Sequence, residues 1–316
     1  MNNAVKFAAK AIVALSALTL LASPVAAQDT PPPADAPAAA APIQLGANLN
    51  ISPKRLTFDR SGKSATVYIF NQGDTASTFD INLVDRVMDP SGQISPVSDA
   101  QGKPELAPYA GKVQSAKPIL LATPRRATLE PGKGQTIRVR VNPGAEATLP
   151  PGEYRTHLTV TTVPPRDIGL TAEQAAKVGP QELSFTIYSV FGVSIPVVVR
   201  LGAADVRAAI ENPSLTFADV SPDGVQPAVR TPMLNFDLVR SGSSSLFGNI
   251  EVRSRSGGKE PIGLARGVGV YTEIERRHIQ VPLTKAPAAG ETLDITFTDD
   301  DTAPGRVLAQ SVFTAP

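Results

Sequence analysis

The sequence predicts an all-β protein made of two antiparallel β-sandwiches. From about Leu49 onward, short segments with an apolar residue at every second position follow one another, separated by Gly, Pro, Asp and Asn. This period of two is typical of strands with one buried face, and hardly any part of the chain has the period of a helix. A chain of 316 residues is long enough to form two domains. The alternating segments are 65–69, 79–83, 137–141, 158–160, 234–238, 250–252, 268–270, 279–281, 293–297 and 307 onward.

The first residues predict a signal peptide for export, residues 1–27. Two lysines precede an apolar run from Ala11 to Leu21, and small residues up to Ala27 mark a cleavage site before Gln28. The run is shorter than the ~20 residues of a membrane-spanning helix. No later segment is long and apolar enough to cross a bilayer, so we expect a soluble product in the periplasm.

Composition divides the remaining chain into a tail and two domains. Residues 28–46 are rich in Pro and Ala and poor in large apolar residues, which predicts a flexible tail. The alternating pattern pauses between Leu201 and Ala208, and we place the domain boundary there. The predicted domains are an N-terminal sandwich over 47–202 and a C-terminal sandwich over 203–316.

Two segments of the N-terminal domain depart from the strand pattern. Residues 89–117 are rich in Pro, Gly and Ser and predict a long loop. The segment Thr171–Lys177 has a capping residue followed three positions later by Gln174, which predicts about two turns of helix. We expect this helix to belong to an insertion before the strand that follows.

That following strand carries the most informative pattern of the chain. Every second residue from Phe185 to Val199 is apolar except Ser189, a period that places these side chains on one face of a strand. A central strand buried on both faces would be apolar at both odd and even positions, whereas the even positions here include Thr, Tyr, Gly and Ser. We therefore expect a half-buried strand at a sheet edge, where it is a template for pairing with another polypeptide.

Composition also excludes several classes of function. The absence of cysteine excludes zinc–thiolate sites and thiol catalysis, and the absence of tryptophan weakens the case for a sugar-stacking lectin. The net charge is +1 with basic and acidic residues interspersed, so nucleic-acid binding is not expected. His157 and His278 are the two histidines, and they lie in different predicted domains without metal-ligand spacing or a nucleophile nearby. We predict a protein that is not an enzyme and uses no metal or other cofactor.

Three short motifs are interpreted as structural. Gly152-Glu153-Tyr154 is typical of the start of an immunoglobulin-type F strand, where a tyrosine hydroxyl bonds back to the preceding corner. Glu130–Gln135 lacks the spacing of a phosphate-binding loop and predicts a tight turn between strands. Asp299-Asp300-Asp301 predicts a solvated turn with side chains bonded to local main chain, rather than a calcium site.

Three matches, taken in order, resemble the first domain of the periplasmic chaperones of the chaperone–usher pilus pathway. Lys54–Asp59 followed by Ser64–Asn71 is similar to the family's opening strand and to its strand ending in Asn. Leu120–Pro124 followed by Leu129–Gly132 is similar to the family's TPP…RLEPG segment and is the most specific match. Leu149–Pro165 is similar to its F strand closing on IPP.

The resemblance covers roughly 51–200 and implies two immunoglobulin-like domains in a boomerang arrangement. The apolar stripe, which ends at Arg200, falls where the family has its G strand. In the family this strand fills the gap left by the missing last strand of a pilin subunit, before delivery to an outer-membrane usher. The resemblance therefore implies a periplasmic chaperone for fimbrium biogenesis, with secreted pilin-like subunits and an usher as partners. Whether the chain also caps itself as a dimer stays open.

Pro196 indicates which part of the stripe is donated. Pro196 cannot donate a ladder hydrogen bond, so it belongs at an edge, a bulge or a strand break. We therefore expect Ile195, Val197 and Val199 to pack within the protein's own core. The residues expected to bind the subunit are Phe185, Ile187, Ser189, Phe191 and Val193.

One further residue is implied as an anchor. The family binds the subunit's C-terminal carboxylate with an arginine on the first strand and a lysine on the G strand. Arg55 matches the arginine, and a guanidinium suits bidentate carboxylate binding. The position of the lysine is held by Pro196, so the second anchor is missing here or comes from elsewhere, such as Lys54.

Two other functions remain open at this point. The first is a pilin-like or adhesive surface protein built of the same sandwiches, which would associate with itself into fibres. The Pro- and Ala-rich tail lacks the alternating apolar residues that a donor strand needs. The second is a secreted hydrolase on a β-sandwich, for which the sequence offers no convergent set of His, Cys and carboxylate residues.

Overall fold

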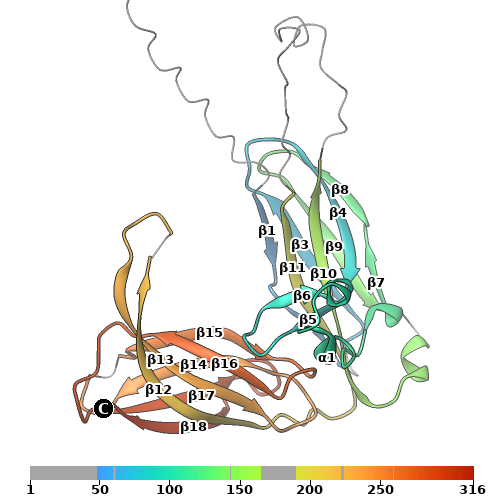
Figure 1. Ribbon diagram of the computed structural model, residues 1–316. Helices are drawn as coiled ribbons and strands as arrows, with labels where there is room; N and C mark the ends of the chain where they lie inside the picture. The colour runs from blue at the N-terminus through green and yellow to red at the C-terminus, as the bar shows by residue number, and fades with distance from the viewer. Residues whose placement is uncertain (1–47, 60–61, 143, 165–189, 222–223, 259) are drawn as a thin grey trace, which may run out of the picture. The chain divides into compact units, whose positions relative to one another are not determined.

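The computed structural model describes residues 48–59, 62–142, 144–164, 190–221, 224–258 and 260–316 (Figure 1). These residues belong to one compact unit, Leu45–Pro316. Most of its regular structure is strand, with a few short helical turns, so the all-β prediction is confirmed. The predicted signal peptide, the Pro- and Ala-rich tail and the predicted helix at Thr171–Lys177 lie outside the described residues.

The described residues between Leu49 and Leu201 form a first sandwich of two sheets. The strand order is β1-β3-β9-β7 in one sheet and β2-β11-β10-β4-β8 in the other. All neighbouring strands are antiparallel except β2 and β11, which run parallel. The strands are β1 (Leu49–Ser52), β2 (Leu56–Phe58), β3 (Ser64–Asn71), β4 (Ser77–Val84), β7 (Leu120–Thr123), β8 (Arg126–Leu129), β9 (Gly134–Val141), β10 (Gly152–Val163) and β11 (Gly192–Leu201).

The inward side chains of these two sheets share one core. The period of two in the sequence turns Val67, Phe79, Val139 and Leu158 inward from four different strands, and all four are fully buried. Burial of an aliphatic or aromatic side chain of this size stabilises a fold by ~1.5–3 kcal/mol. The core therefore fixes the register of β10 and β11, which carry the site described below.

Two of the predicted structural motifs are confirmed in this sandwich. The hydroxyl of Tyr154 donates a hydrogen bond to the carbonyl oxygen of Pro150 at 2.9 Å, which closes the corner before β10. Between β8 and β9 the N–H of Lys133 donates to the carbonyl of Glu130 at 3.0 Å. Gly132 in this turn has φ +69°, a conformation that favours glycine.

The segment predicted as a long loop, 89–117, is more regular than expected. Strand β5 (Arg86–Met88) pairs with β6 (Ile94–Pro96). Short helical turns follow at η1 (Val97–Gln101), α1 (Ala107–Ala110) and η2 (Lys117–Ile119), and η3 (Ala145–Thr148) lies further along the chain. These elements have three to five residues, too few to show a hydrophobic period in a sequence.

The remaining residues form a second sandwich around a second core. Its sheets have the orders β12-β13-β16 and β15-β14-β17-β18. Leu234, Phe236, Ile295 and Phe297 are fully buried between them. The strands are β12 (Ala208–Val220), β13 (Val229–Arg240), β14 (Leu246–Ser254), β15 (Gly263–Val270), β16 (Arg276–Pro282), β17 (Thr292–Asp299) and β18 (Val307–Thr314). All six strands predicted for this half are present.

Strand β12 was not predicted, although it has 13 residues. Its pairing with β13 is interrupted between Glu211 and Ser214 by a bulge, where Asn212 has φ +54°. Beyond the bulge most of its side chains are exposed, including Phe217. A strand with little burial on either face has no alternating pattern to detect.

Candidate functional site

Strand β11 has one fully paired edge and one edge that is half open. Strand β10 pairs with it from Gly192 to Leu201. On the other side β2 pairs only with Val197–Val199. Among the described residues no strand pairs with this second edge between Gly192 and Pro196, a segment that we call the open edge of β11. The predicted edge strand is thus an edge only in its first half, because β2 covers the second half.

The main chain shows which residues face the open edge. The carbonyl of Phe191 accepts a hydrogen bond from the N–H of Thr162 at 2.8 Å, so the main-chain groups of Phe191 point toward β10. In an antiparallel ladder this direction alternates along the strand. The main-chain groups of Gly192, Ser194 and Pro196 therefore point to the open edge. Pro196 lacks an N–H at a position where β10 does not need one, which explains why the strand tolerates it.

The side chains of the apolar stripe change from exposed to buried along the open edge of β11. Ile195, Val197 and Val199 are buried in the core of the first sandwich, as expected. Val193 is partly buried at the margin of that core, whereas the side chain of Phe191 is 51% exposed. The other three residues predicted to bind a subunit, Phe185, Ile187 and Ser189, lie outside the described residues. In the described part of the stripe, Phe191 is the large apolar side chain that a partner can cover.

The outer face of the same sheet carries rows of polar side chains. The residues of β10 that alternate with core residues point to this face, and each has a neighbour at the same level on β11. Thr159 and Ser194 form the first row, with their hydroxyl oxygens 2.8 Å apart. The next rows are His157 with Pro196, Arg155 with Val198, and Glu153 with Arg200. Despite their polarity, all four of these β10 side chains are buried.

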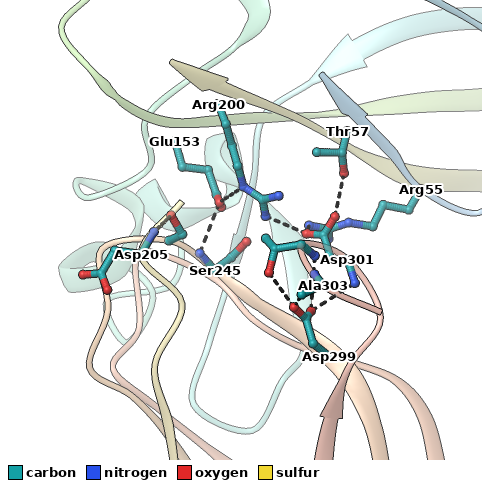
Figure 2. A network of polar contacts seen from close by, with 11 residues as sticks. Arg55, Thr57, Glu153, Arg200, Asp205, Ser245, Asp299, Asp301 and Ala303 are labelled. Atoms are coloured by element: carbon teal, nitrogen blue, oxygen red, sulfur yellow. Dashed lines mark hydrogen bonds and ion pairs between the residues drawn. The ribbon is translucent and has the colours of Figure 1, made fainter. Parts of the chain in front are cut away.

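Arg55, the predicted carboxylate anchor, already contacts a carboxylate of the chain itself (Figure 2). Its Nη2 lies 2.9 Å from Oδ2 of Asp301, and Nη2 of Arg200 lies 2.6 Å from the same oxygen. The hydroxyl of Thr57 donates to Oδ1 of Asp301 at 3.2 Å, and the Arg55 guanidinium lies 4.5 Å from the centre of the Phe247 ring. Burial alone would raise the pKa of Asp301, but Arg200 and Arg55 outweigh it and hold the pKa below its ordinary value.

Lys54, considered as a second anchor, takes no part in this network. Its Nζ donates to the side-chain oxygen of Asn50 at 3.0 Å on the exposed surface. Arg200 instead makes the second contact, and its Nε also donates to Glu153 at 2.9 Å. Arg200 therefore already binds two carboxylates, those of Asp301 and Glu153, whereas Lys54 binds none in this network.

The turn that presents Asp301 follows β17. As predicted, an aspartate side chain organises it through local main chain: Asp299 accepts hydrogen bonds from the N–H groups of Asp301 at 3.0 Å and Ala303 at 2.8 Å. The prediction that the turn is solvated is wrong, because Asp299 is buried and the Asp301 side chain is 8% exposed. A rigid turn of this kind holds the Asp301 carboxylate in place for the two arginines.

A second buried ion pair lies one row along the sheet. The Arg155 guanidinium binds Glu273 through two parallel contacts, Nη1 to Oε2 at 2.9 Å and Nη2 to Oε1 at 2.7 Å. Arg155 also lies 3.7 Å from the centre of the Tyr271 ring, and the N–H of Met88 donates to Glu273 at 2.8 Å. Neither ion-pair network was predicted from the sequence, because a charged residue at every second position of a strand ordinarily indicates a solvent-exposed face.

His157 is enclosed by cations. Its ring is 2% exposed and lies edge-on to Tyr271, with a centroid separation of 6.1 Å. Burial, with the positive charges of Arg155, Arg86 and Arg55, lowers the pKa of His157 to about 2. The imidazole is therefore neutral in the folded chain at any pH at which the protein is expected to work.

This burial predicts an acid-sensitive fold. The unfolded chain takes up a proton at its ordinary pKa of 6.5, while the folded chain does not, so the unfolded state binds more protons below that pH. We expect the free energy of unfolding to fall by about 2 kcal/mol from neutral pH to about pH 5 through His157 alone. Urea unfolding of the parent and of His157→Leu across this range measures the difference. His278→Gln, at an exposed histidine, is the control. Parallel pH profiles for parent and His157→Leu would contradict the prediction.

Two kinds of site are not found in the part of the chain that the structure describes. No helix there is long and apolar enough to cross a membrane. No group of three or more His, Cys, Asp or Glu side chains there is arranged to hold a metal ion.

Fold and site together define a class of protein: two β-sandwiches, of which the first has an unpaired strand edge beside a buried polar network. No protein-family model matches the chain, and no curated protein matches its sequence. Solved structures of fimbrial chaperones are similar to it over most of its length. The Escherichia coli chaperone DraB is 12% identical, covers 85% of this chain and 96% of its own, and has a TM-score of 0.38. The Pseudomonas aeruginosa chaperone CupB2 is 12% identical, with 84% and 98% covered and a TM-score of 0.38.

A third similar structure is a chaperone together with its ligand. The Salmonella enterica chaperone SafB, solved in complex with the SafA pilin, is 11% identical to this chain. The match covers 84% of this chain and 96% of the other, with a TM-score of 0.37.

Proposed function

We propose that this chain is a periplasmic assembly chaperone that lends β11 and the residues before it to an incomplete sandwich of a secreted, pilin-like subunit. The observation that carries the proposal is the open edge of β11 with Phe191 exposed beside it. Unpaired main-chain groups and an apolar side chain on one strand are what strand addition requires. The three sequence matches to the chaperone family and the predicted signal peptide point the same way.

The open edge sets where a partner strand ends. Gly192 and Ser194 offer both main-chain groups to it, Pro196 offers only its carbonyl, and β2 begins opposite Val197. A partner strand can therefore pair up to the level of Ser194 and stops where β2 begins. Covering Phe191 contributes ~1.5–3 kcal/mol before the cost of ordering, so the contact is firm but can be exchanged. Such exchange is what delivery of a subunit to an outer-membrane usher requires.

Arg55 lies at that stopping point and is proposed as the anchor for the partner's C-terminal carboxylate. It directly precedes β2, and its Nε and Nη1 have no hydrogen-bond partner among the described residues, although both are buried. Only Nη2 is used, by Asp301. A guanidinium with two nitrogens that have no acceptor can donate to a second carboxylate while keeping the first.

Replacing Phe191 with Asp tests strand donation. We expect the tagged wild-type chain, purified from the periplasm of its native host, to carry one copy of a secreted sandwich protein that lacks its last strand. Phe191→Asp places a charge in the contact and should weaken this complex by roughly tenfold or more. Mass spectrometry of the purified complex and a titration of the isolated partner measure the loss.

Phe217→Asp is the matched control, because Phe217 is 49% exposed on β12 of the second sandwich. It should leave the complex intact. A Phe191→Asp chain that still carries its partner at wild-type affinity would contradict strand donation at this site. Fibres formed by the purified chain alone would favour the pilin-like or adhesive alternative instead.

A further inference from the structure

Strands β12 and β13 of the second sandwich run past the sheet to which they belong. β13 pairs with β16 only over Met233–Val239, whereas its pairing with β12 continues to Val229. Beyond Pro232, the two strands form a ribbon that no third strand joins among the described residues, and Figure 1 shows this ribbon extending past the other strands of the sandwich. A two-stranded ribbon is only marginally stable in water by itself. A further strand alongside it would therefore stabilise it.

The outer edge of β12 has main-chain groups to offer to such a strand. β12 is the end strand of its sheet, so no described strand pairs with this edge. The carbonyl of Pro232 accepts a hydrogen bond from the N–H of Leu283 at 2.9 Å, so the main-chain groups of Pro232 point away from β12. Phe217 is directly opposite Pro232, and in an antiparallel ladder the main-chain groups of such a pair both point outward. The N–H and carbonyl of Phe217 therefore face the open side, and alternation gives Leu215 and Asp219 the same direction.

This edge lacks the usual protection against pairing. Exposed edge strands ordinarily carry lysine or proline, which discourage another strand from adding. The segment Ser214–Val220 contains neither, and Asp219 is its one charged residue. The side chain of Phe217 is 49% exposed, and the Arg230 guanidinium lies 5.2 Å from the centre of its ring. An apolar side chain beside unpaired main-chain groups is what strand addition uses.

The same segment fits a second copy of itself. Its regular pairing with β13 begins at Ser214, directly after the bulge, and ends at Val220, so Phe217 is its middle residue. Two such segments in antiparallel orientation place Phe217 opposite Phe217 of the second copy, beside a twofold axis. Asp219 then lies opposite Leu215 of the second copy, so the two Asp219 carboxylates do not face each other. Neither charge nor main-chain direction opposes this pairing.

We propose that the chain forms a twofold-symmetric dimer in which Ser214–Val220 pairs antiparallel with the same segment of a second copy. The two Phe217 rings cover each other, and the outward main-chain groups of Leu215, Phe217 and Asp219 complete the ladder. Two three-stranded sheets thereby join into one continuous sheet. The dimer goes beyond the function proposed above, and its contact lies on β12 rather than on the open edge of β11.

Sedimentation equilibrium of the mature chain, purified without a partner, measures the dimer. We expect the apparent mass to approach that of two chains as the concentration rises. Phe217→Asp places like charges opposite each other and should weaken the dimer by about tenfold or more. Val312→Asp is the matched control, because Val312 is 51% exposed on β18, the end strand of the other sheet. Phe191→Asp should also leave the dimer unchanged, so Phe191 and Phe217 separate the subunit contact from the dimer contact.

Cysteine cross-linking tests the register. The chain has no cysteine, so an introduced thiol is the sole one in each copy. Under a mild oxidant Phe217→Cys should form disulfide-linked dimers by itself, since directly opposite residues of an antiparallel pair have Cα atoms within disulfide range. Thr216 lies opposite Ala218 of the second copy, so Thr216→Cys and Ala218→Cys should cross-link efficiently only when the two variants are mixed. Val312→Cys is the control and should remain unlinked.

Four results would overturn the proposal. The first is a chain that stays monomeric at every concentration. The second is a dimer that Phe191→Asp abolishes and Phe217→Asp leaves intact, which would place the contact at β11. The third is a mixture of Thr216→Cys and Ala218→Cys that cross-links no faster than either variant alone. The fourth is Phe217→Cys that cross-links in the periplasm to a secreted subunit or an outer-membrane protein instead of to a second copy, which would assign the edge to that partner.

Discussion

Replacing Glu273 with Ala is expected to lower the free energy of unfolding by about 3–5 kcal/mol. Arg155 and Glu273 are 3% and 0% exposed, and they meet through two parallel contacts. The variant leaves the guanidinium buried without its carboxylate and leaves the N–H of Met88 without its acceptor. Both losses act on the folded state, where water cannot replace the missing partner.

Urea unfolding of the mature chain measures this effect. Asp294→Asn is the matched control: it breaks the contact between Arg255 and Asp294, whose side chains are 55% and 41% exposed, and should cost below about 1 kcal/mol. The double variant Arg155→Met with Glu273→Met removes both buried charges and should recover part of the stability, while the N–H of Met88 still lacks its acceptor. Equal losses for the buried and the exposed pair, or a double variant as unstable as Glu273→Ala, would contradict the role assigned to this ion pair.

The strands of the two sandwiches were predictable because packing against a core requires an apolar residue at every second position of a strand. Val67, Val139 and Leu158 alternate with polar residues since each sheet has one face on the core. The same rule misleads at β10, where Glu153, Arg155 and His157 alternate with core residues and are buried as well. Sequence periodicity shows which face is apolar, but it does not show whether the polar face is wet.

The pairing of β2 with β11 could not be predicted from the sequence. Whether β11 is an edge or an interior strand depends on a segment of three residues more than a hundred positions away, paired in parallel with Val197–Val199. Pro196 did indicate where β11 passes from an open edge to a paired one, because a proline is tolerated where no main-chain donor is needed. Arg55 was identified as an anchor by the resemblance to the chaperone family. Its contact with Asp301 joins residues 246 positions apart, and no local sequence pattern predicts such a contact.

Replacing Asp301 with Ala is expected to cost about 3 kcal/mol of folding free energy, because Arg55 and Arg200 then share no carboxylate. Asp300→Ala, at the exposed neighbour in the same turn, is the control and should cost little. The free energy of unfolding from urea titrations measures both. Near-equal stability of the two variants would contradict a stabilising role for the Asp301 network.

The dependence on pH has a definite sign. The pKa of Asp301 is lowered in the folded chain, so its stabilisation is fully present above the ordinary value of 3.8 and is lost as the pH falls through the lower, folded value. The stability difference between the parent and Asp301→Ala should therefore shrink in strong acid.

The variant also frees Nη2 of Arg55, whose other nitrogens have no partner in the described chain. If Arg55 anchors a partner's carboxylate, Asp301→Ala should bind that carboxylate more tightly while folding less stably. A variant that loses both stability and carboxylate affinity would show instead that Asp301 is needed to position the arginine.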